Sequence, residues 1–457
     1  MLLYDSLRGK LKEFPEGGSA PVTIYACGPT VYQYASIGNL RTFLTTDLLR
    51  RYLEYRGLEV KLVMNITDVG HMLNDADTGE DKMTASAAKE GKTPEEIARF
   101  YEEAFFRDLD AVNFKRAWKH PRATEHIPQM VALVEKLLEE GHAYVTEKND
   151  VYFDVASFKD YGKLSGNSVD DLVAGARVEV KDDKKHPADF ALWIHNPNHV
   201  MQWKGPRGIQ GYPGWHLECS AMAKEYLGDT LSLHIGGEDL KFPHHECEIA
   251  QSESANHAPF SKHWLHVSFL LVEGEKMSKS KGNTYTLPDL VAKGYSPEAV
   301  RFLLLSSQYR TQFNFTFEGL KAAERTLAQM RSVTEQFAGA DPVKGAYETR
   351  LVEAMDDDMN VSAVLAIVHG FMTEANKGNI DKNEGASFMR AFDGIFGLRL
   401  FETKSQQIPD EVQALAQMRA EARANKDWAA SDRLRDEIAA KGWVAEDTPQ
   451  GQKLKKA

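Results

Sequence analysis

Two lysines in a short, glycine-flanked segment carry the clearest chemical signal in this 457-residue chain. Lys276 and Lys279 lie three residues apart in the sequence KMSKS, between Gly274 and Gly282. We predict a mobile cationic loop, which can close on a triphosphate and neutralise the charge that develops as pyrophosphate leaves. The alternative is a solvated lysine-rich turn, which the spacing of two lysines alone would favour.

A turn upstream has the residues that a nucleotide needs in order to approach the backbone. The sequence CGPTVY at 27–32 leads to Ser36, Gly38 and Asn39 at the start of a predicted helix. Glycine leaves room for the nucleotide, and the N-terminus of a helix favours its phosphates. The turn therefore favours a phosphate-binding role for the lysine segment.

The elements around this turn predict a parallel α/β sheet. Residues 22–27 are apolar and β-branched and stop at a Gly-Pro turn, which indicates a buried strand. Apolar side chains recur at helical spacing over 37–57, and residues 59–66 return as a strand. Strand, helix and strand form a βαβ unit, so the predicted fold class is α/β.

The rest of the chain predicts an insertion and a helical C-terminal third. A capping box at 93–96 opens a helix through about residue 111, and another helix runs from about 127 to 140. Residues 142–205 hold short strands and polar turns, which we interpret as an insertion into the sheet. From residue 296 the pattern is helical, with one small helix predicted at 411–440.

Composition and charge exclude several classes of protein. The chain is 42% hydrophobic and 27% charged, which excludes a largely disordered protein. Lys and Arg number 55 against 67 Asp and Glu, and the net charge of −12 argues against an indiscriminate polyanion binder but leaves room for a local basic patch. Three scattered cysteines, no signal-peptide core and no apolar run of bilayer length predict a soluble cytoplasmic protein.

Together the turn and the lysine loop resemble the two signatures of class I aminoacyl-tRNA synthetases. Further motifs narrow the resemblance to the bacterial cysteinyl-tRNA synthetase family and cover essentially the whole chain. They are ACGPTVY at 26–32, NITDV at 65–69, PGWHLECSAM at 213–222, GGEDLKFPHHECE at 236–248 and DDDMN at 356–360. The resemblance implies activation of L-cysteine with ATP and its transfer to the 3′ end of tRNA-Cys.

The resemblance also implies a domain organisation, with a split Rossmann-like catalytic domain and an all-α tRNA-binding region after it. The expected parts are the catalytic domain at 1–141 and 206–295, an inserted connective subdomain at 142–205, a helical stem-contact segment at 296–338, a helical bundle at 339–405 and a small anticodon-binding module at 406–457. A monomer is expected.

The resemblance places one zinc ion on two thiolates, one imidazole and one carboxylate, a suitable ligand set. The ligands would be Cys27, Cys219, His244 and Glu248. The two cysteines are expected at distant strand ends, and His244 and Glu248, four apart, can share a helix face. His245 and Cys247 would point off that face, so we rank both as non-ligands. An isolated buried cysteine is more often a packing residue than a ligand.

A zinc ion would explain a preference for cysteine over serine. The substrate thiol can bind the metal as a thiolate, whereas the hydroxyl of serine is a far poorer ligand. Discrimination would then occur in one step, and no editing domain is needed.

The resemblance assigns the remaining site residues to ATP and to cysteine. Adenylation depends mainly on positioning and charge stabilisation, so we assign no general base, and Mg²⁺ is expected to accompany ATP. The expected catalytic residues are Lys276, Lys279, Ser36 and Asn39; the ATP contacts are Ser36, Gly38, Gly236, Gly237, Asp239 and Lys279; the cysteine contacts are Gly28, Thr67, Trp215 and His234. Trp215 could instead be a core aromatic, and His234 a structural histidine.

Ser36 departs from the family pattern, in which a histidine at this position contacts the ATP phosphates. Serine can donate one hydrogen bond but cannot carry imidazolium charge. We therefore predict a slower adenylation step, or compensation by another group such as His71.

The C-terminal third is expected to bind tRNA through phosphate contacts and base stacking. The candidates are Arg423, Arg433, Arg435 and Trp443. Arginines on an amphipathic helix are often only a solvated face. The family often ends with a tryptophan shortly after the glycine-containing tail, and this chain lacks it.

Two other functions fit parts of the sequence. A cysteine ligase of the mycothiol type would share the fold and zinc site but pass cysteine to an amino sugar, and it would lack the module at 406–457. A catalytically inactive paralogue that binds RNA is supported by Ser36 alone. Intact lysines and zinc candidates argue against it.

Overall fold

Two compact units, residues 1–401 and 402–457, make up the chain. The computed structural model describes residues 1–15, 21–70, 82–167, 183–278, 281–402, 409–448 and 451–456. Within these ranges, no helix has both the length and the apolar character needed to cross a membrane.

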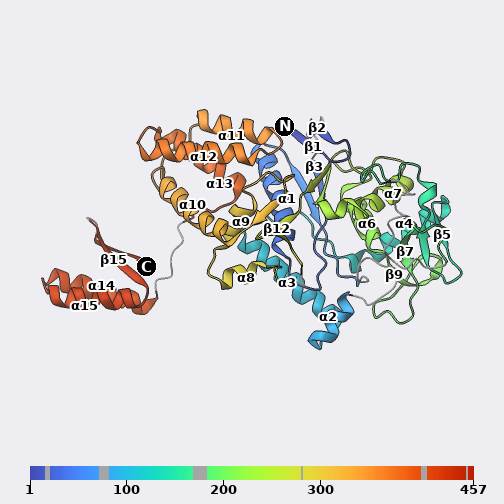
Figure 1. Ribbon diagram of the computed structural model, residues 1–457, viewed down its shortest axis with the longest axis horizontal. Coiled ribbons are helices and arrows are strands. Elements are labelled where there is room, and N and C mark those ends of the chain that lie inside the picture. Colours follow the sequence, from blue (N-terminus) through green and yellow to red (C-terminus); the bar gives the residue numbers. More distant parts are fainter. Residues whose placement is uncertain are drawn as a thin grey trace. The chain divides into compact units, whose positions relative to one another are not determined.

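A four-stranded parallel sheet lies at the centre of the first unit (Figure 1). Its order is β11-β10-β3-β4, and every neighbouring pair is parallel. The strands are β3 (Val22–Ala26), β4 (Val60–Met64), β10 (Leu233–Gly237) and β11 (Trp264–Val267). Helix α1 (Ile37–Tyr55) crosses from β3 to β4, so the predicted βαβ unit and the α/β fold class are confirmed.

The pleat of this sheet divides its side chains between two cores, because successive residues of a strand point to opposite faces. Ile24 and Ala26 enter one core with α1 and α3, whereas Tyr25 and Cys27 enter the other. The helices of the first core include α2 (Lys82–Glu90) and α3 (Pro94–Ala111); those of the second are α4 (Ile127–Glu139), α6 (Trp215–Leu227) and α7 (His244–Asn256).

Helix α3 begins at the capping box that the sequence predicts. The Thr93 hydroxyl accepts from the Glu96 amide at 3.2 Å, and the Glu96 carboxylate accepts from the Thr93 amide at 2.8 Å. Proline follows Thr93 at the first helical position, where its missing N–H has no helical partner to lose.

The insertion forms a five-stranded antiparallel sheet, as its short strands and polar turns predict. Its order is β5-β6-β7-β9-β8. Strand β9, the last of these in the sequence, pairs with β7 as far as Pro213. The strands are β5 (Ala143–Val145), β6 (Val151–Phe153), β7 (Phe190–Ile194), β8 (Trp203–Lys204) and β9 (Gln210–Pro213).

The remainder of the first unit adds two small sheets and a helical region. The strands are β1 (Leu2–Asp5), β2 (Lys10–Glu13), β12 (Leu270–Val272), β13 (Glu275–Lys276) and β14 (Phe313–Phe315). The helices are α8 (Leu287–Ala292), α9 (Pro297–Leu304), α10 (Phe317–Glu335), α11 (Ala346–Asp356), α12 (Val361–Asn376) and α13 (Lys382–Phe396). Short 3-10 turns are η2 (Ala123–His126), η3 (Val155–Ser157), η4 (Pro206–Gly208) and η5 (Glu238–Lys241).

The second unit differs from the single helix predicted at 411–440. Helix α14 (Asp410–Ala424) ends at Asn425, and Asp427 caps a second helix, α15 (Trp428–Ala440). Short polar side chains bond to nearby backbone groups, so they favour caps and turns over a helix interior. An antiparallel hairpin of β15 (Trp443–Thr448) and β16 (Gly451–Lys456) follows. The expectation of an all-α tRNA-binding region is therefore wrong for the second unit.

A buried arginine joins the sheet layer to the helical region of the first unit. The Arg301 guanidinium donates to the Asp47 carboxylate at 2.6 Å and to the carbonyl oxygens of Val112 and Phe396 at 3.0 and 2.5 Å. Neither side chain of the ion pair is exposed. Arg51 is a second partner of Asp47, at 2.7 Å.

We predict that Arg301→Leu lowers the free energy of unfolding by about 3 kcal/mol, because a buried carboxylate and several carbonyls lose their donor. The control is Arg107→Leu, which breaks an exposed pair with Glu103 and should change stability by less than about 1 kcal/mol. Urea unfolding followed by circular dichroism measures both. If both variants lowered the free energy of unfolding equally, the buried Arg301–Asp47 pair would not stabilise the fold more than an exposed pair does.

Candidate functional site

The carboxyl end of the parallel sheet and two helices packed on one face bring the predicted metal ligands together. Cys27 directly follows β3 and lies in the core that α6 and α7 share. Cys219 belongs to α6, and His244 and Glu248 belong to α7. Cys219 therefore lies inside a helix and not at a strand end as expected. Helix α6 starts after Gly214, and α7 starts after Pro243.

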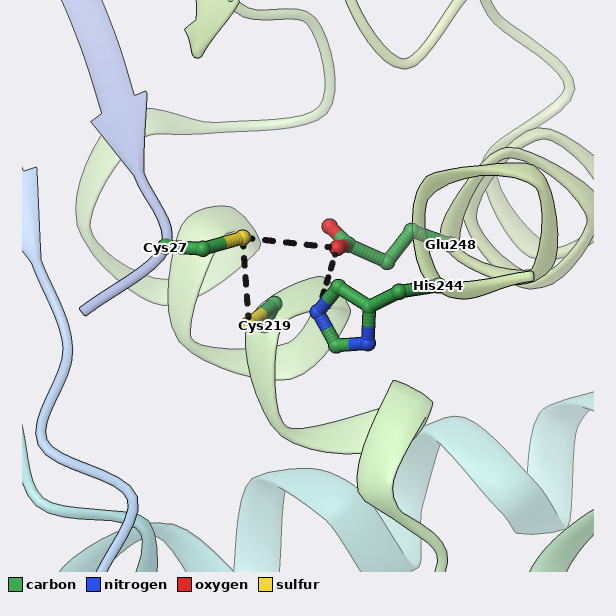
Figure 2. Close-up of side chains that lie close together, drawn as sticks. All are labelled: Cys27, Cys219, His244 and Glu248. Carbon is green, nitrogen blue, oxygen red and sulfur yellow. Dashed lines mark hydrogen bonds and ion pairs between the residues drawn. The ribbon is translucent and has the colours of Figure 1, made fainter. Parts of the chain in front are cut away.

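Four donor atoms from these elements form one buried cluster (Figure 2). The Cys27 sulfur lies 3.9 Å from the Cys219 sulfur and 3.8 Å from Glu248 Oε1, which lies 2.9 Å from His244 Nε2. All four donors lie within 4.8 Å of one another. Two sulfurs bound to a tetrahedral zinc ion at ~2.3 Å would be about 3.8 Å apart, so the observed spacing fits zinc.

Neighbouring histidines orient two of these donors. His234 Nε2 lies 2.8 Å from Glu248 Oε2, which leaves Oε1 toward Cys27 and His244. His216 Nδ1 lies 3.0 Å from His244 Nδ1, so the opposite ring nitrogen of His244 faces the cluster. Such contacts are typical of the groups that fix metal ligands from behind.

The charges of the cluster favour an ionised carboxylate. Burial would raise the pKa of Glu248, but the imidazoles of His234 and His244 outweigh it and hold the pKa at about 2. Burial would lower the pKa of His244, but the negative charges of Glu248 and Cys219 raise it to about 10. In the absence of a metal, His244 and Glu248 therefore form an ion pair.

The two thiols differ in their acidity. Burial is the main cause that raises the pKa of Cys27, whereas a hydrogen bond from Cys27 lowers the pKa of Cys219. Cys219 is thus the first of the pair to become a thiolate, the form in which cysteine binds metals.

His245 is closer to the cluster than the sequence predicts. Its Nε2 lies 3.3 Å from the Cys27 sulfur, and its Nδ1 lies 2.8 Å from His266 Nε2. The expectation that His245 points away is wrong, because the first nine residues of α7 are all buried and no single face is the inner one. A second group of possible ligands, Cys27, His234, His245 and Glu248, therefore overlaps the first.

Cys247 lies elsewhere. Its sulfur is 3.4 Å from the Tyr161 hydroxyl, and burial raises the pKa of its thiol. Neither group of possible metal ligands among the described residues contains it.

A cavity of about 490 Å³ opens beside the cluster. The residues that line it come from the cluster (Cys27), from the turn before α1 and from the lysine segment. The predicted site residues on the wall are Cys27, Gly28, Ser36, Gly38, Asn39, Trp215, Gly237, Asp239 and Lys276. Burial raises the pKa of Asp239.

The start of α1 is a closed capping arrangement. The Ser36 hydroxyl donates to Asn39 Oδ1 at 2.7 Å and accepts from the Asn39 amide at 3.3 Å. The Ile37 amide donates to the Tyr285 carbonyl at 2.9 Å. Across the described ranges, Gly38 is the residue of this first turn whose amide has no acceptor, and it lies in the cavity wall.

The lysine segment lies directly over this turn. A Cβ on Gly38 would come within 2.6 Å of the Met277 methyl group, the flexible end of that side chain, so the two segments are in close contact. Asn283 joins both sides of the loop, because its side chain accepts from the Ser278 amide at 2.8 Å and donates to the Lys276 carbonyl at 3.2 Å. Lys279 and His71 lie outside the described residues.

Three predicted contacts lie behind the cavity wall. Thr67 is buried and donates to Glu218 Oε2 at 2.8 Å, and His234 is buried against Glu248 and Trp264. A Cβ on Gly236 would meet the ring of His245 at 2.5 Å.

In the second unit, Trp443, a predicted tRNA contact, is buried, and another tryptophan, Trp428, is exposed. Trp443 is 6% exposed and packs in the core of the unit, whereas Trp428 is 56% exposed. The Arg423 guanidinium lies 5.7 Å from the centre of the Trp428 ring. Sequence reasoning missed Trp428, although its position at the first turn of a helix, after a capping aspartate, indicates exposure. Arg433 and Arg435 are exposed on α15.

Three family models match the chain. Residues 14–325 match the class I tRNA synthetase (C) catalytic domain, residues 350–401 the DALR domain, and residues 405–453 the cysteinyl-tRNA ligase anticodon binding domain. Curated relatives match along nearly the whole chain. The cysteine–tRNA ligase of Thermus thermophilus is 42% identical over 99% of this chain and 98% of its own length, and that of Chlorobaculum tepidum is 39% identical over 98% and 97%.

Among solved structures, methionyl-tRNA synthetase of Mycobacterium tuberculosis in complex with methionyl-adenylate has a similar fold. Its TM-score is 0.59 at 14% identity, over 90% of this chain and 96% of that one.

Proposed function

The chain belongs to the cysteine–tRNA ligase family of class I aminoacyl-tRNA synthetases, and we propose that its buried sulfur cluster selects the substrate. In this proposal L-cysteine binds in the cavity with its thiol toward Cys27, Cys219, His244 and Glu248. Its carboxylate points toward the nucleotide turn. The observation that carries the proposal is that Cys27 and the turn residue Gly38 line one cavity.

The four donors would hold one zinc ion, and the 3.9 Å between the two sulfurs supports this assignment. Zinc, when bound, supplies a soft Lewis acid that prefers a thiolate to the hydroxyl of serine. His234 and His216 would keep Glu248 and His244 oriented. Trp215, on the cavity wall 4.4 Å from the His244 ring, would confine the substrate side chain.

Activation needs positioning and charge neutralisation more than proton transfer. The carboxylate oxygen of cysteine attacks the α-phosphorus of ATP, and the bond to pyrophosphate breaks as the acyl–phosphate bond forms. The Gly38 amide and the N-terminus of α1 would receive phosphate oxygens. Lys276 and Lys279 would neutralise the departing pyrophosphate, with Mg²⁺ accompanying ATP, while Asp239 and Gly237 would contact the adenosine.

Transfer then joins cysteine to the tRNA. A ribose hydroxyl at the 3′ end attacks the carbonyl carbon of the adenylate, and AMP leaves. In the second unit Trp428 and Arg423 would stack on an anticodon base, while Arg433 and Arg435 would contact phosphates. We further propose that the chain acts as a monomer.

The module at the C-terminus distinguishes this function from a ligase that uses an amino sugar. The match of residues 405–453 to the anticodon binding domain favours tRNA as the acceptor. An inactive paralogue is disfavoured because the four donors converge in one buried group that could hold a metal ion.

The function is tested by charging unfractionated tRNA with labelled cysteine, with serine as the control. We expect ATP-dependent labelling with cysteine alone, since a single methylene-sized difference could supply only about 1–3 kcal/mol of discrimination and the metal supplies more. Removal of zinc by a chelator should abolish labelling. Equal labelling with serine, or none with cysteine, would contradict the proposal.

Two adjacent histidines of α7 provide a matched test of the ligand set. We predict that Cys219→Ser and His244→Gln lose most of the bound zinc, whereas His245→Gln retains it with an affinity reduced no more than about 10–100-fold, the effect of a group behind the ligands. Elemental analysis of the dialysed protein measures zinc per chain. Loss of zinc from the His245 variant alone would favour the overlapping group.

Ser36 provides a test of the nucleotide turn. We predict that Ser36→His speeds cysteine activation, measured by ATP–pyrophosphate exchange, because an imidazolium adds charge beside the phosphates. Ser36→Ala is the control; it should lower stability by about 1 kcal/mol through loss of the cap and leave the exchange rate no faster. The hypothesis fails if Ser36→His leaves the rate unchanged.

A further inference from the structure

Three aromatic side chains form a cluster on the surface of the first unit. The ring of Tyr34 lies 5.2 Å from that of Tyr101 and 6.3 Å from that of Phe100, and the rings of Phe100 and Tyr101 lie 5.1 Å apart. All three contacts are edge-to-face. The Lys92 ammonium lies 4.3 Å from the centre of the Phe100 ring. We call these four residues the rim cluster.

The rim cluster is continuous with the mouth of the cavity. Tyr34 is one of the residues that line the cavity, in the segment between the Cys27 turn and α1. Phe100 and Tyr101 lie in α3, which packs against α2. The Ser86 hydroxyl of α2 donates to the Tyr32 carbonyl at 3.0 Å, which fastens this pair of helices to the same segment.

The rings remain open to solvent although they are close to one another. Tyr34 is 38% exposed and Phe100 is 37% exposed, whereas most aromatic side chains of the unit are buried or half-buried. The Tyr101 hydroxyl donates to Glu90 at 2.6 Å, which fixes the orientation of the ring beneath them. A rigid, exposed aromatic surface next to a catalytic cavity indicates a binding surface more than a packing defect.

We propose that the rim cluster is a stacking platform for the unpaired nucleotides at the 3′ end of the acceptor RNA. The inference rests on the proposed function, since the terminal ribose must reach an adenylate in the cavity that Tyr34 lines. Single-stranded nucleotides are bound by aromatic rings that stack on the bases and by cations that contact the backbone. Phe100 and Tyr34 supply the rings, and Lys92 supplies the cation.

We expect the aromatic rings to contribute more to RNA binding than the Lys92 ammonium. Lys92 already pairs with Glu90 at 2.9 Å, so a phosphate would compete with a carboxylate for the same ammonium. The Lys92 ammonium also lies over the Phe100 ring, so a base that stacks on Phe100 must use the other face of the ring or displace the ammonium.

A second exposed aromatic of the unit has the same chemistry in another place. Trp118 is 46% exposed, and its ring lies 5.4 Å from the Lys61 ammonium and 5.7 Å from the Lys119 ammonium. It is not among the residues that line the cavity, because its segment pairs with β4 at the edge of the sheet. Trp118 is therefore the matched control.

The experiment compares Phe100→Ala with Trp118→Ala in the full-length protein. Filter binding measures affinity for tRNA-Cys and for the same tRNA lacking its unpaired 3′ nucleotides. We expect Phe100→Ala to weaken binding of the intact tRNA about tenfold, the size expected for one lost stacking contact, and to leave binding of the shortened tRNA unchanged. Phe100→Trp should restore the affinity, and Trp118→Ala should change neither.

ATP–pyrophosphate exchange separates this inference from the function on which it rests, because it needs no tRNA. Cysteine-dependent exchange at the wild-type rate in Phe100→Ala shows an intact fold and active site. If Phe100→Ala binds both tRNAs with the wild-type affinity, or loses affinity for both equally, the stacking platform is disproved and the proposed function stands. Absence of cysteine-dependent exchange and charging in the wild type would overturn both.

Discussion

An ionised carboxylate in a fully buried position is the constraint on which the rest of the site depends. Glu248 has no exposed surface, and a buried charge is tolerated only when it is paired and hydrogen-bonded. Its two oxygens contact His234 on the sheet and His244 one helical turn before it, and Cys27 approaches one of them. The fold must therefore bring β3, β10 and α7 to one point, and the same convergence creates a group of side chains that could hold a metal ion.

The connectivity of the sheet explains why a cavity lies beside that point. The chain leaves β3 through α1 and enters β4 on one side, whereas β10 and β11 are added later on the other side. In parallel sheets, ligands bind at the carboxyl ends of the strands where the order reverses in this way. Gly28 after β3, Gly237 at the end of β10 and Ser268 after β11 all line the cavity. One topological feature therefore places the proposed thiol-binding residues and the proposed nucleotide-binding residues on one cavity.

The sequence predicts the parts of this arrangement that depend on local pattern. The apolar, β-branched run at 22–27, the capping box at Thr93 and the four-residue spacing of His244 and Glu248 each have a physical meaning that needs no partner. His245 was misplaced because the face of a helix is informative only when one side meets solvent, and the start of α7 does not. The sequence predicts Trp443 as a stacking residue although it is buried, because exposure depends on the packing of the second unit, which local pattern does not give.

The first turn of α1 shows how a substitution in a signature motif can preserve one role and give up another. A helix begins with amides that lack helical acceptors, and the side chain before it must satisfy some of them. Ser36 and Asn39 satisfy each other, and the Tyr285 carbonyl takes the Ile37 amide. The Gly38 amide has no acceptor among the described residues. Under the proposed function, the neutral turn would bind an anion through this amide and the helix dipole but would contribute no full positive charge, so Lys276 and the rest of its segment would have to supply the charge that the reaction needs.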